Sequence, residues 1–376
     1  MTGWNGWAAL KGELSGGAPA VGRNADGRLE VFVEAPGTTS ATDPGLATSP
    51  LVGIEAIRAA AATLRGIAIR TPLVPFGRPE TRRFLKAESL QPIGAFKIRG
   101  AYVAVESLTA EERKRGVITY SSGNHAQGVA RAARLLGVPV VVVMPSDAPA
   151  LKKARVEADG AQVVVVGTSS EERQQVAEEI AARRGLALIP PYDDDRIIAG
   201  QGTVGLEIAE DLPDVAAVLM PIGGGGLASG VAAAVRALVP GARLIGVEPE
   251  LAADARQSLR EGRIVRWAAA DVSRTIADGT RTIAIGQRNF AHLSMLLDDI
   301  VTVSEDEIAA GVRLAAEESR LVVEPSGALA VAAIAFRSAE AGLDDLDGPI
   351  VAVVSGGNVD PDLYRALLAS PIPDRR

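Results

Sequence analysis

The chain has 376 residues, of which 47% are hydrophobic and 3% aromatic, and its formal net charge at pH 7 is −7. This acidic balance, without a block of Lys or Arg, argues against nucleic acid as a partner. Because the chain has no cysteine, disulfides, thiolate metal sites and cysteine nucleophiles are excluded. No apolar run approaches the roughly 20 residues of a membrane-spanning helix, so we expect a cytoplasmic protein that contacts no membrane.

The first 49 residues differ in character from the rest of the chain. They hold two of the three tryptophans and are rich in Gly, Pro, Ser and Thr, with one alternating apolar run at residues 28–33. Residues 1–35 resemble part of one blade of a lectin-type β-propeller. Since a single blade cannot bury its own faces, we expect residues 1–49 to be an atypical extension, either a hairpin or a poorly ordered linker. A carbohydrate-binding fusion is the alternative.

From residue 51 onward the sequence alternates between helical and strand patterns. Strand followed by helix, repeated with short loops, predicts the α/β class with doubly wound, parallel open sheets. Ligands bind such sheets outside the carboxyl ends of the strands. The predicted strands cover residues 84–88, 116–120, 138–144, 162–166, 187–188, 217–221, 243–247, 300–303 and 349–354, and the predicted helices cover residues 50–64, 95–108, 126–136, 149–159, 170–184, 200–211, 227–239, 305–318 and 327–339.

Lys97 stands directly after Phe96, at the start of an apolar segment and between small, flexible residues. A lysine in such a setting can lose its hydration, which lowers the pKa of the amine and frees it for carbonyl chemistry. A surface lysine at the start of a helix is the commoner case. The choice between the two therefore depends on other parts of the chain.

Four consecutive glycines, Gly223, Gly224, Gly225 and Gly226, join a predicted strand to a predicted helix. Their backbone N–H groups can close on an anion, and the helix N-terminus adds its dipole. The run matches neither the dinucleotide fingerprint nor the nucleoside-triphosphate loop, so it favours a single phosphate group. A flexible turn is the alternative.

A second strand-to-helix junction is rich in hydrogen-bonding groups. Ser121, Ser122, Asn124 and His125 lie there. Ordinary helix capping explains one such residue. Capping does not explain four such residues, so the junction is also a candidate binding site for a carboxylate.

Together, these loops and the lysine resemble fold-type II, or β-family, pyridoxal-phosphate enzymes, and most of all the serine/threonine dehydratases and serine racemases. The resemblance begins near residue 51 and extends to Ser355-Gly356-Gly357-Asn358 and the chain end. It implies two doubly wound open-sheet domains, the smaller inserted in the larger. Residues 50–107 and 195–376 would form the large, cofactor-binding domain and residues 108–194 the small domain. A homodimer is implied as well.

The resemblance also implies roles for individual residues. Lys97 would bond to the aldehyde of pyridoxal 5'-phosphate and then act as the base at the α-carbon, with Ser122 as the second catalytic residue. Ser355 would face the pyridine nitrogen, where other pyridoxal folds use Asp; a hydroxyl makes a weaker electron sink, which suits β-elimination. The chain departs from the family pattern at Ala95, where Ser is common. The remaining implied cofactor contacts are Phe96, Asn124, Gly223, Gly224, Gly225, Gly226, Gly279 and Glu324, and the implied substrate contacts are Ser121, Ser122, Asn124, His125 and Arg173.

Oxygen ligands suited to a hard cation follow the predicted strand at residues 243–247. The resemblance implies that Glu248, the carbonyl of Ala252 and Asp254 hold a divalent cation such as Mg²⁺, Ca²⁺ or Mn²⁺. Ordinary acidic surface residues are the alternative. We expect His292, in contrast, to be structural.

The expected function is that of a pyridoxal-phosphate-dependent L-threonine/L-serine dehydratase, an ammonia-lyase that turns a small amino acid into a 2-oxo acid and ammonia. The alternative is a racemase of serine or a related amino acid, because racemases of this family share every residue named above. Little sequence follows Ser355, so we expect no isoleucine feedback.

Overall fold

The computed structural model describes residues 20–23, 29–32, 50–121, 123–148, 150–168 and 170–374. The chain divides into two compact units, residues 1–51 and 52–376, which are described separately. In the first unit, β1 (Ala20–Arg23) pairs antiparallel with β2 (Leu29–Phe32). The hairpin expected in this part of the chain is therefore present, whereas the remainder of the predicted propeller blade lies outside the described residues.

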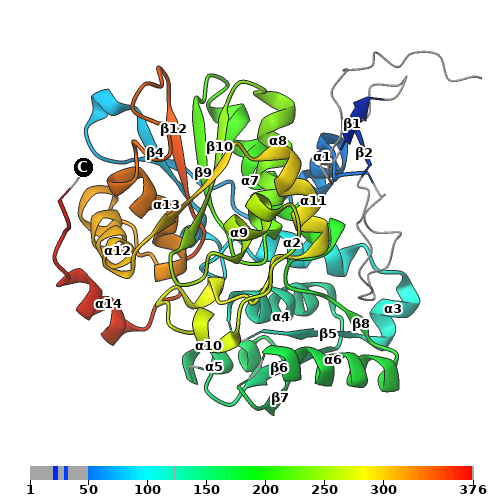
Figure 1. Ribbon diagram of the computed structural model, residues 1–376. Helices are drawn as coiled ribbons and strands as arrows, with labels where there is room; N and C mark the ends of the chain where they lie inside the picture. The colour runs from blue at the N-terminus through cyan, green and yellow to red at the C-terminus, as the bar shows by residue number, and fades with distance from the viewer. Residues whose placement is uncertain are drawn as a thin grey trace, which may run out of the picture. The chain divides into compact units, whose positions relative to one another are not determined.

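The second unit contains two sheets with helices on both faces, as the α/β prediction requires (Figure 1). The larger sheet has six strands in the order β11-β10-β9-β12-β4-β3, all parallel except for the antiparallel edge strand β3. Its strands are β3 (Leu73–Pro75), β4 (Arg83–Ala87), β9 (Ala217–Pro221), β10 (Arg243–Pro249), β11 (Asp299–Val303) and β12 (Ile350–Val354). The smaller sheet is fully parallel, with the order β7-β6-β5-β8. Its strands are β5 (Val117–Tyr120), β6 (Val140–Pro145), β7 (Gln162–Val166) and β8 (Ala187–Leu188).

Helices α12 and α13 lie on one side of the larger sheet and α7 and α8 on the other, while α4 and α6 enclose the smaller sheet (Figure 1). The strands of the smaller sheet all lie between residues 117 and 188; the division at residues 107/108 and 194/195 stays a prediction. The α-helices are α1 (Ile54–Thr63), α2 (Ile98–Glu106), α3 (Ala110–Arg115), α4 (Asn124–Leu136), α5 (Ala150–Ala158), α6 (Ser170–Arg184), α7 (Asp195–Asp211), α8 (Gly226–Leu238), α9 (Asp254–Glu261), α10 (Ala269–Val272), α11 (Gln287–Leu296), α12 (Glu305–Ser319), α13 (Pro325–Phe336) and α14 (Pro361–Leu368), and the 3-10 turns are η1 (Pro79–Thr81), η2 (Glu88–Leu90) and η3 (Asp278–Thr280).

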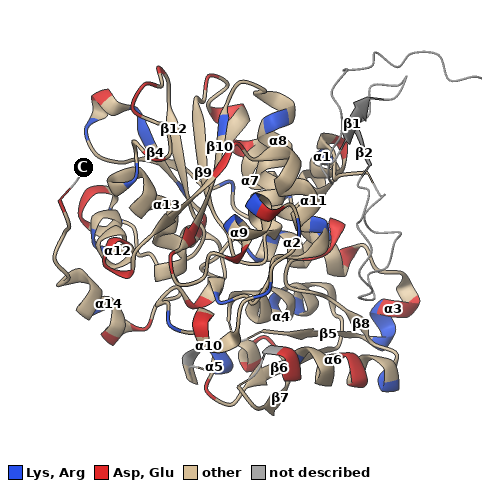
Figure 2. Cartoon of the chain, viewed as in Figure 1, with Lys and Arg blue, Asp and Glu red and all other residues tan. Residues whose placement is uncertain are grey.

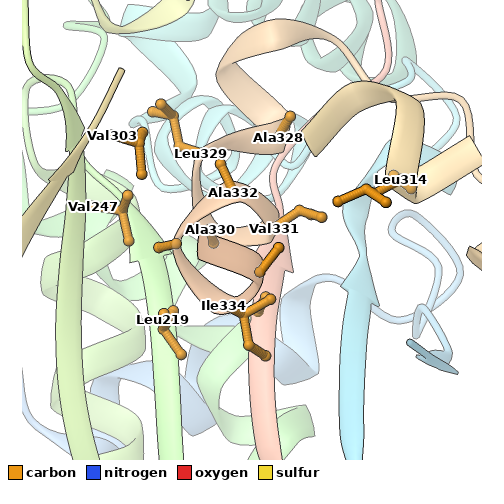
Figure 3. Packing of buried hydrophobic residues seen from close by; sticks show 14 of the residues in the cluster. Leu219, Val247, Val303, Leu314, Ala328, Leu329, Ala330, Val331, Ala332 and Ile334 are labelled. Atoms are coloured by element: carbon orange, nitrogen blue, oxygen red, sulfur yellow. The ribbon is translucent and has the colours of Figure 1, made fainter. Parts of the chain in front are cut away.

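The core of the larger sheet is organised around α13. Every residue of this helix is buried, which is the behaviour of a helix that is apolar on all sides. Its side chains pack against Leu219, Val247 and Val303 from three neighbouring strands and against Leu314 of α12 (Figure 3). The larger sheet therefore packs against a fully buried helix over several of its strands.

The helix that follows Lys97, α2, is held against α7 at a point where neither helix has a side chain. A Cβ on Gly200 would lie only 2.5 Å from the Cα of Gly100. The two backbones can approach this closely only because both residues are glycine. The contact fixes the position of the first turn of α2.

A cluster of buried charged residues also holds α2 in place. Arg99 is 1% exposed and makes ion pairs with Glu88 and Glu207 at 2.8 and 2.6 Å. Lys86 is fully buried and pairs with Glu207 at 2.7 Å. Burial alone would raise the pKa of Glu88, but the charge and hydrogen bonds of Arg99 hold it below its usual value. With two positive and two negative groups, the cluster is electrically balanced, and it links α2 to β4 and α7.

Candidate active site

The segment before α2 is tied to the end of the last strand of the larger sheet. Ala95 forms an antiparallel bridge with Gly356, and the amide of Phe96 donates to the carbonyl of Ser355 at 3.0 Å. Lys97 then occupies the N-cap position of α2. The structure thus brings together Lys97 and Ser355, which lie far apart in the sequence.

The amine of Lys97 lies inside the protein although the residue as a whole is partly exposed. Its Nζ donates to the carbonyl of Pro191 at 2.7 Å and lies 5.1 Å from the centre of the Phe96 ring. Loss of hydration lowers the pKa of Lys97 to about 8, from an ordinary value of 10.5. About a tenth of the amine is therefore uncharged at pH 7, far more than in an ordinary lysine.

The glycine run forms the turn between β9 and α8, with Gly225 at φ +99°. A Cβ on Gly224 would lie 2.2 Å from the ring of Tyr192, and one on Gly223 would lie 3.1 Å from the Cα of Thr280. A turn this crowded accepts only glycine. Because the first N–H groups of a helix have no partner within it, the turn presents free donors and the positive end of a helix dipole.

Tyr192 connects the glycine turn to the lysine, and we assigned it no role from the sequence. It follows Pro191, whose carbonyl accepts from Lys97, and its ring covers Gly224. Burial raises the pKa of Tyr192 to about 12, so the phenol stays neutral. The neighbouring Asp193 accepts from the amides of Gln287 and Arg288, which anchors this loop to α11.

The predicted cofactor contacts Gly279, Glu324 and Ser355 are joined through Ser326. The amide of Gly279 donates to the Ser326 hydroxyl at 2.8 Å, and the Ser355 hydroxyl donates to the Ser326 carbonyl at 3.4 Å. Glu324, two residues earlier, accepts from the amide nitrogen of Asn124 at 2.6 Å. Burial, together with the nearby charge of Asp278, raises the pKa of Glu324 to about 7.

Asn124 begins α4 and links the two sheets. Its side-chain oxygen accepts from Asn358 at 2.8 Å, while its nitrogen donates to Glu324. Ser121 stabilises the turn before α4, since its hydroxyl accepts from the amide of Gly123 at 3.2 Å. Ser122 lies outside the described residues. The junction from Ser121 to His125 therefore lies beside the loops of the larger sheet.

His125 is buried and faces a backbone carbonyl. Its Nε2 lies 3.1 Å from the carbonyl of Ile189, so this nitrogen must carry the hydrogen. Burial, assisted by the charge of Lys97, lowers the pKa of His125 to about 3. The imidazole is thus neutral, and an attraction between a charged His125 and a substrate carboxylate is ruled out; its role in substrate binding stays a prediction.

Arg173 lies on α6, and its guanidinium donates to the carbonyl of Thr168 at 3.0 Å.

His292 is fully buried, accepts from the amide of Val52 at its Nε2 and faces the carbonyl of Arg288 at its Nδ1. Both of its nitrogens are engaged by backbone, as expected of a structural histidine.

The predicted cation ligands Glu248 and Asp254 are buried. Glu248 accepts from the amides of Ala255 and Arg256, at 3.0 and 2.7 Å. Neither carboxylate oxygen of Asp254 has a hydrogen-bond partner among the described residues. Burial raises the pKa of both groups, that of Asp254 to about 7, and the charge of Asp254 adds to the rise at Glu248. The described residues hold no group of three or more Asp, Glu, His or Cys that could bind a metal.

These groups fit a phosphorylated aldehyde cofactor. The glycine turn offers a phosphate site that side chains cannot enter, and Lys97 offers a weakly basic amine. Pro191 and Tyr192 span the distance between the two.

The fold and the site define a pyridoxal-phosphate enzyme, and the comparison with family models agrees. The model described as "Pyridoxal-phosphate dependent enzyme" matches residues 64–356, and the chain belongs to this family. Nothing in the comparisons supports the predicted lectin resemblance of residues 1–35. Within the described residues, no helix is long and apolar enough to cross a membrane.

Three relatives illustrate the range of activities in the family. The chain is 44% identical over 287 residues to L-threo-3-hydroxyaspartate ammonia-lyase of Saccharomyces cerevisiae, covering 76% of this chain and 86% of that one. It is 40% identical to serine racemase of Schizosaccharomyces pombe, with the same coverage. The structure of threonine deaminase isoform 2 from Solanum lycopersicum superposes with a TM-score of 0.77 at 36% identity, covering 85% of this chain and 96% of that one.

Proposed function

We propose that the protein is a pyridoxal-phosphate-dependent ammonia-lyase that converts a small β-hydroxy amino acid into a 2-oxo acid and ammonia. L-Threonine and L-serine are the substrates predicted from the sequence, and L-threo-3-hydroxyaspartate is a third. The observation that carries the proposal is the amine of Lys97. Loss of hydration lowers its pKa to about 8, and it donates to the carbonyl of Pro191, next to the Tyr192 ring that covers Gly224.

The cofactor, when bound, draws electrons away from the α-carbon of the amino acid, which makes the α-proton acidic. Its phosphate would be held by Gly223, Gly224, Gly225 and Gly226 and its ring hydroxyl by Asn124. Ser355 would meet the ring nitrogen. Because a serine hydroxyl is neutral, it stabilises a protonated nitrogen less than a carboxylate does, and this favours elimination, in which the leaving group removes the electrons.

Lys97 would move the protons of the reaction. A base works best when its pKa lies near the working pH, and the desolvated amine of Lys97 meets this condition. We propose that it takes the α-proton, that the β C–O bond then breaks, and that the departing oxygen receives this proton from Lys97 and leaves as water. The enamine product takes up a proton, and water replaces its nitrogen, which leaves as ammonia. The net change is an amino acid converted to a 2-oxo acid and ammonia.

The substrate carboxylate would bind at the start of α4. Backbone N–H groups and the helix dipole favour an anion there, and the hydroxyl of Ser121 lies in the same turn. Ser122 and the backbone beside His125 are predicted to complete the seat, with Arg173 as an outer contact.

The proposal is tested by loading the purified protein with pyridoxal phosphate and adding each of the three amino acids. We expect equal amounts of 2-oxo acid and ammonia from at least one of them. A loaded, folded protein that releases neither product from any of the three would contradict the proposal.

A serine racemase is the second candidate, and the resemblance to the Schizosaccharomyces pombe racemase supports it. Racemisation needs a second base on the opposite face of the substrate, the role predicted for Ser122. Chiral analysis of a reaction with L-serine separates the two functions. Formation of D-serine at a rate near that of pyruvate would favour the racemase, whereas pyruvate alone would favour the lyase.

We also propose, from the resemblance, that the protein is a homodimer and that Glu248, the carbonyl of Ala252 and Asp254 hold a divalent cation. The two unpartnered oxygens of Asp254 support the cation, because a buried carboxylate without hydrogen bonds is costly. Adding Mg²⁺ or Ca²⁺ should raise the melting temperature by a few degrees, roughly 2–5 °C, and Asp254→Asn should abolish this increase. An equal increase in the variant would count against the site.

A further inference from the structure

Helix α5 reaches from the smaller sheet to two loops of the larger sheet. The ammonium of Lys152 donates to Asp278 at 2.6 Å, and the guanidinium of Arg155 donates to the side-chain oxygen of Asn358 at 2.6 Å. Lys152 and Arg155 are separated by three positions, so they lie on the same face of the helix. That face of α5 therefore forms a wall of the candidate active site.

The partners of these two cations belong to the site already described. Asn358 donates to the side-chain oxygen of Asn124 at 2.8 Å, so Arg155 lies only two side chains away from the start of α4. A Cβ on Gly123 would lie 3.3 Å from the Nζ of Lys152, which places this ammonium directly over the same turn. A carboxylate bound at the turn would thus lie beneath α5.

The two cations differ in how their charge is balanced. Lys152 is paired with a carboxylate, Asp278, at 2.6 Å. Arg155 is half-buried and donates to a neutral amide, and no carboxylate among the described residues pairs with it. A guanidinium has five N–H donors in a flat fork that matches a carboxylate. Arg155 therefore gives this wall of the site a positive charge that no described carboxylate balances, together with N–H donors that are not used in the bond to Asn358.

We propose that Arg155 selects a substrate with a second carboxylate, a β-hydroxy amino dicarboxylic acid such as L-threo-3-hydroxyaspartate. This inference rests on the proposed function, since it assumes that the α-carboxylate binds at the start of α4. We place the side chain of such a substrate against α5, where Lys152, Arg155, Asp278 and Asn358 are all polar. The methyl group of threonine gains nothing from this wall, whereas a second carboxylate can accept hydrogen bonds from the guanidinium of Arg155.

The test compares kcat/KM for L-threo-3-hydroxyaspartate and L-threonine in the cofactor-loaded enzyme. We expect the wild type to prefer hydroxyaspartate, and the ratio of the two kcat/KM values to fall by about 30-fold or more in Arg155→Met, the loss of a hydrogen-bonded charge pair. Arg155→Lys keeps the charge but loses the fork, so it should fall in between. Lys153→Met is the matched control, because Lys153 is the next cation on α5 and pairs with Glu157 at 3.8 Å; its ratio should match that of the wild type.

Two outcomes would overturn the inference while leaving the proposed function intact: a wild type that prefers threonine, or an Arg155→Met variant whose ratio is unchanged. Absence of elimination from every amino acid would contradict the proposed function instead. In that case, calorimetric titration with succinate and with butyrate still decides the inference. Succinate should bind more tightly than butyrate to the wild type and lose this advantage in Arg155→Met, and equal binding of the two acids to the wild type would refute dicarboxylate recognition.

Discussion

Two lysines close together in the sequence, Lys86 and Lys97, have opposite surroundings. Lys86 is fully buried, and its ammonium is bonded to the carboxylate of Glu207 and the carbonyl of Thr71. Lys97 is partly exposed, and its amine has a carbonyl and an aromatic ring as neighbours instead of a carboxylate. The more deeply buried lysine is thus the one whose charge is compensated.

The contrast shows that burial alone does not make a lysine reactive. A buried cation with an anionic partner is part of a balanced pair, and removing either member leaves the other uncompensated. A cation that has lost its hydration and has only dipoles as neighbours holds its proton less tightly, so its pKa falls. Lys86 therefore holds the fold together, whereas Lys97 is available for chemistry.

The largest effects are expected from two substitutions, one of which should remove activity and the other stability. Lys97→Met should lower lyase activity by at least about 10³-fold and leave the protein folded, because no charge partner is abandoned. Lys86→Met should lower the free energy of unfolding by about 3–5 kcal/mol, because it leaves two carboxylates, Glu88 and Glu207, with Arg99 as the one remaining cation of the cluster. Activity assays and urea unfolding of both variants check the pair. Loss of activity without loss of stability in Lys86→Met would contradict this division of roles between the two lysines.

Arg99→Met should cause the next largest change. It removes the cation that pairs with Glu88 and one of the two cations that pair with Glu207, so we expect the free energy of unfolding to fall by about 3–5 kcal/mol. Urea unfolding followed by circular dichroism measures this. The fully exposed pair of Arg365 and Asp362 provides the control: Arg365→Met should cost less than about 1 kcal/mol. Equal losses in the two variants would mean that the buried cluster does not hold α2.

The pH dependence of the Lys97 amine sharpens the comparison further. Because its pKa is lowered to about 8, the amine is charged below that pH and increasingly uncharged above it. The rate at which cofactor-free protein combines with pyridoxal phosphate should therefore rise with pH and level off above about 8. Stopped-flow absorbance between pH 6 and 10 gives the midpoint. A midpoint near 10.5, the ordinary value for lysine, would show that the amine is not desolvated.

The smallest expected effect concerns the cofactor phosphate. In Gly224→Ala the new methyl group would meet the ring of Tyr192, so the turn must shift. We expect the affinity for pyridoxal phosphate to fall by about tenfold, since overpacking costs about 1–3 kcal/mol. Gly241→Ala is the matched control, because nothing lies within 4 Å of its Cβ position. Fluorescence titration measures both, and equal affinities would mean that Gly224 does not shape the site.

Most of the fold was predictable because strand patterns in parallel sheets are simple. Strands β7 (Gln162–Val166) and β9 (Ala217–Pro221) have the predicted bounds. The predicted start of α7 was wrong. The helix begins at Asp195, more than one turn before the predicted residue 200, because the side chain of Asp194 caps it. Helices α9 and α11 were missed, since short polar helices in an irregular region carry little periodic signal.

The candidate site was predictable where its chemistry is local. Lys97 and the glycine turn stand out through their immediate neighbours. The roles of Tyr192, Arg155 and Asn358 were not predictable, because they come from contacts across the fold: Arg155 and Asn358 are 203 positions apart, and Asn358 and Asn124 are 234. A single sequence shows these residues as ordinary polar and aromatic side chains.

The most direct test of the central claim is chemical. The protein, loaded with pyridoxal phosphate, is reduced with borohydride to fix the cofactor to the amine that holds it, digested, and analysed by mass spectrometry. The account predicts one modified peptide, containing Lys97. Modification at another lysine, such as Lys86 or Lys152, or the absence of any modified peptide, would contradict it.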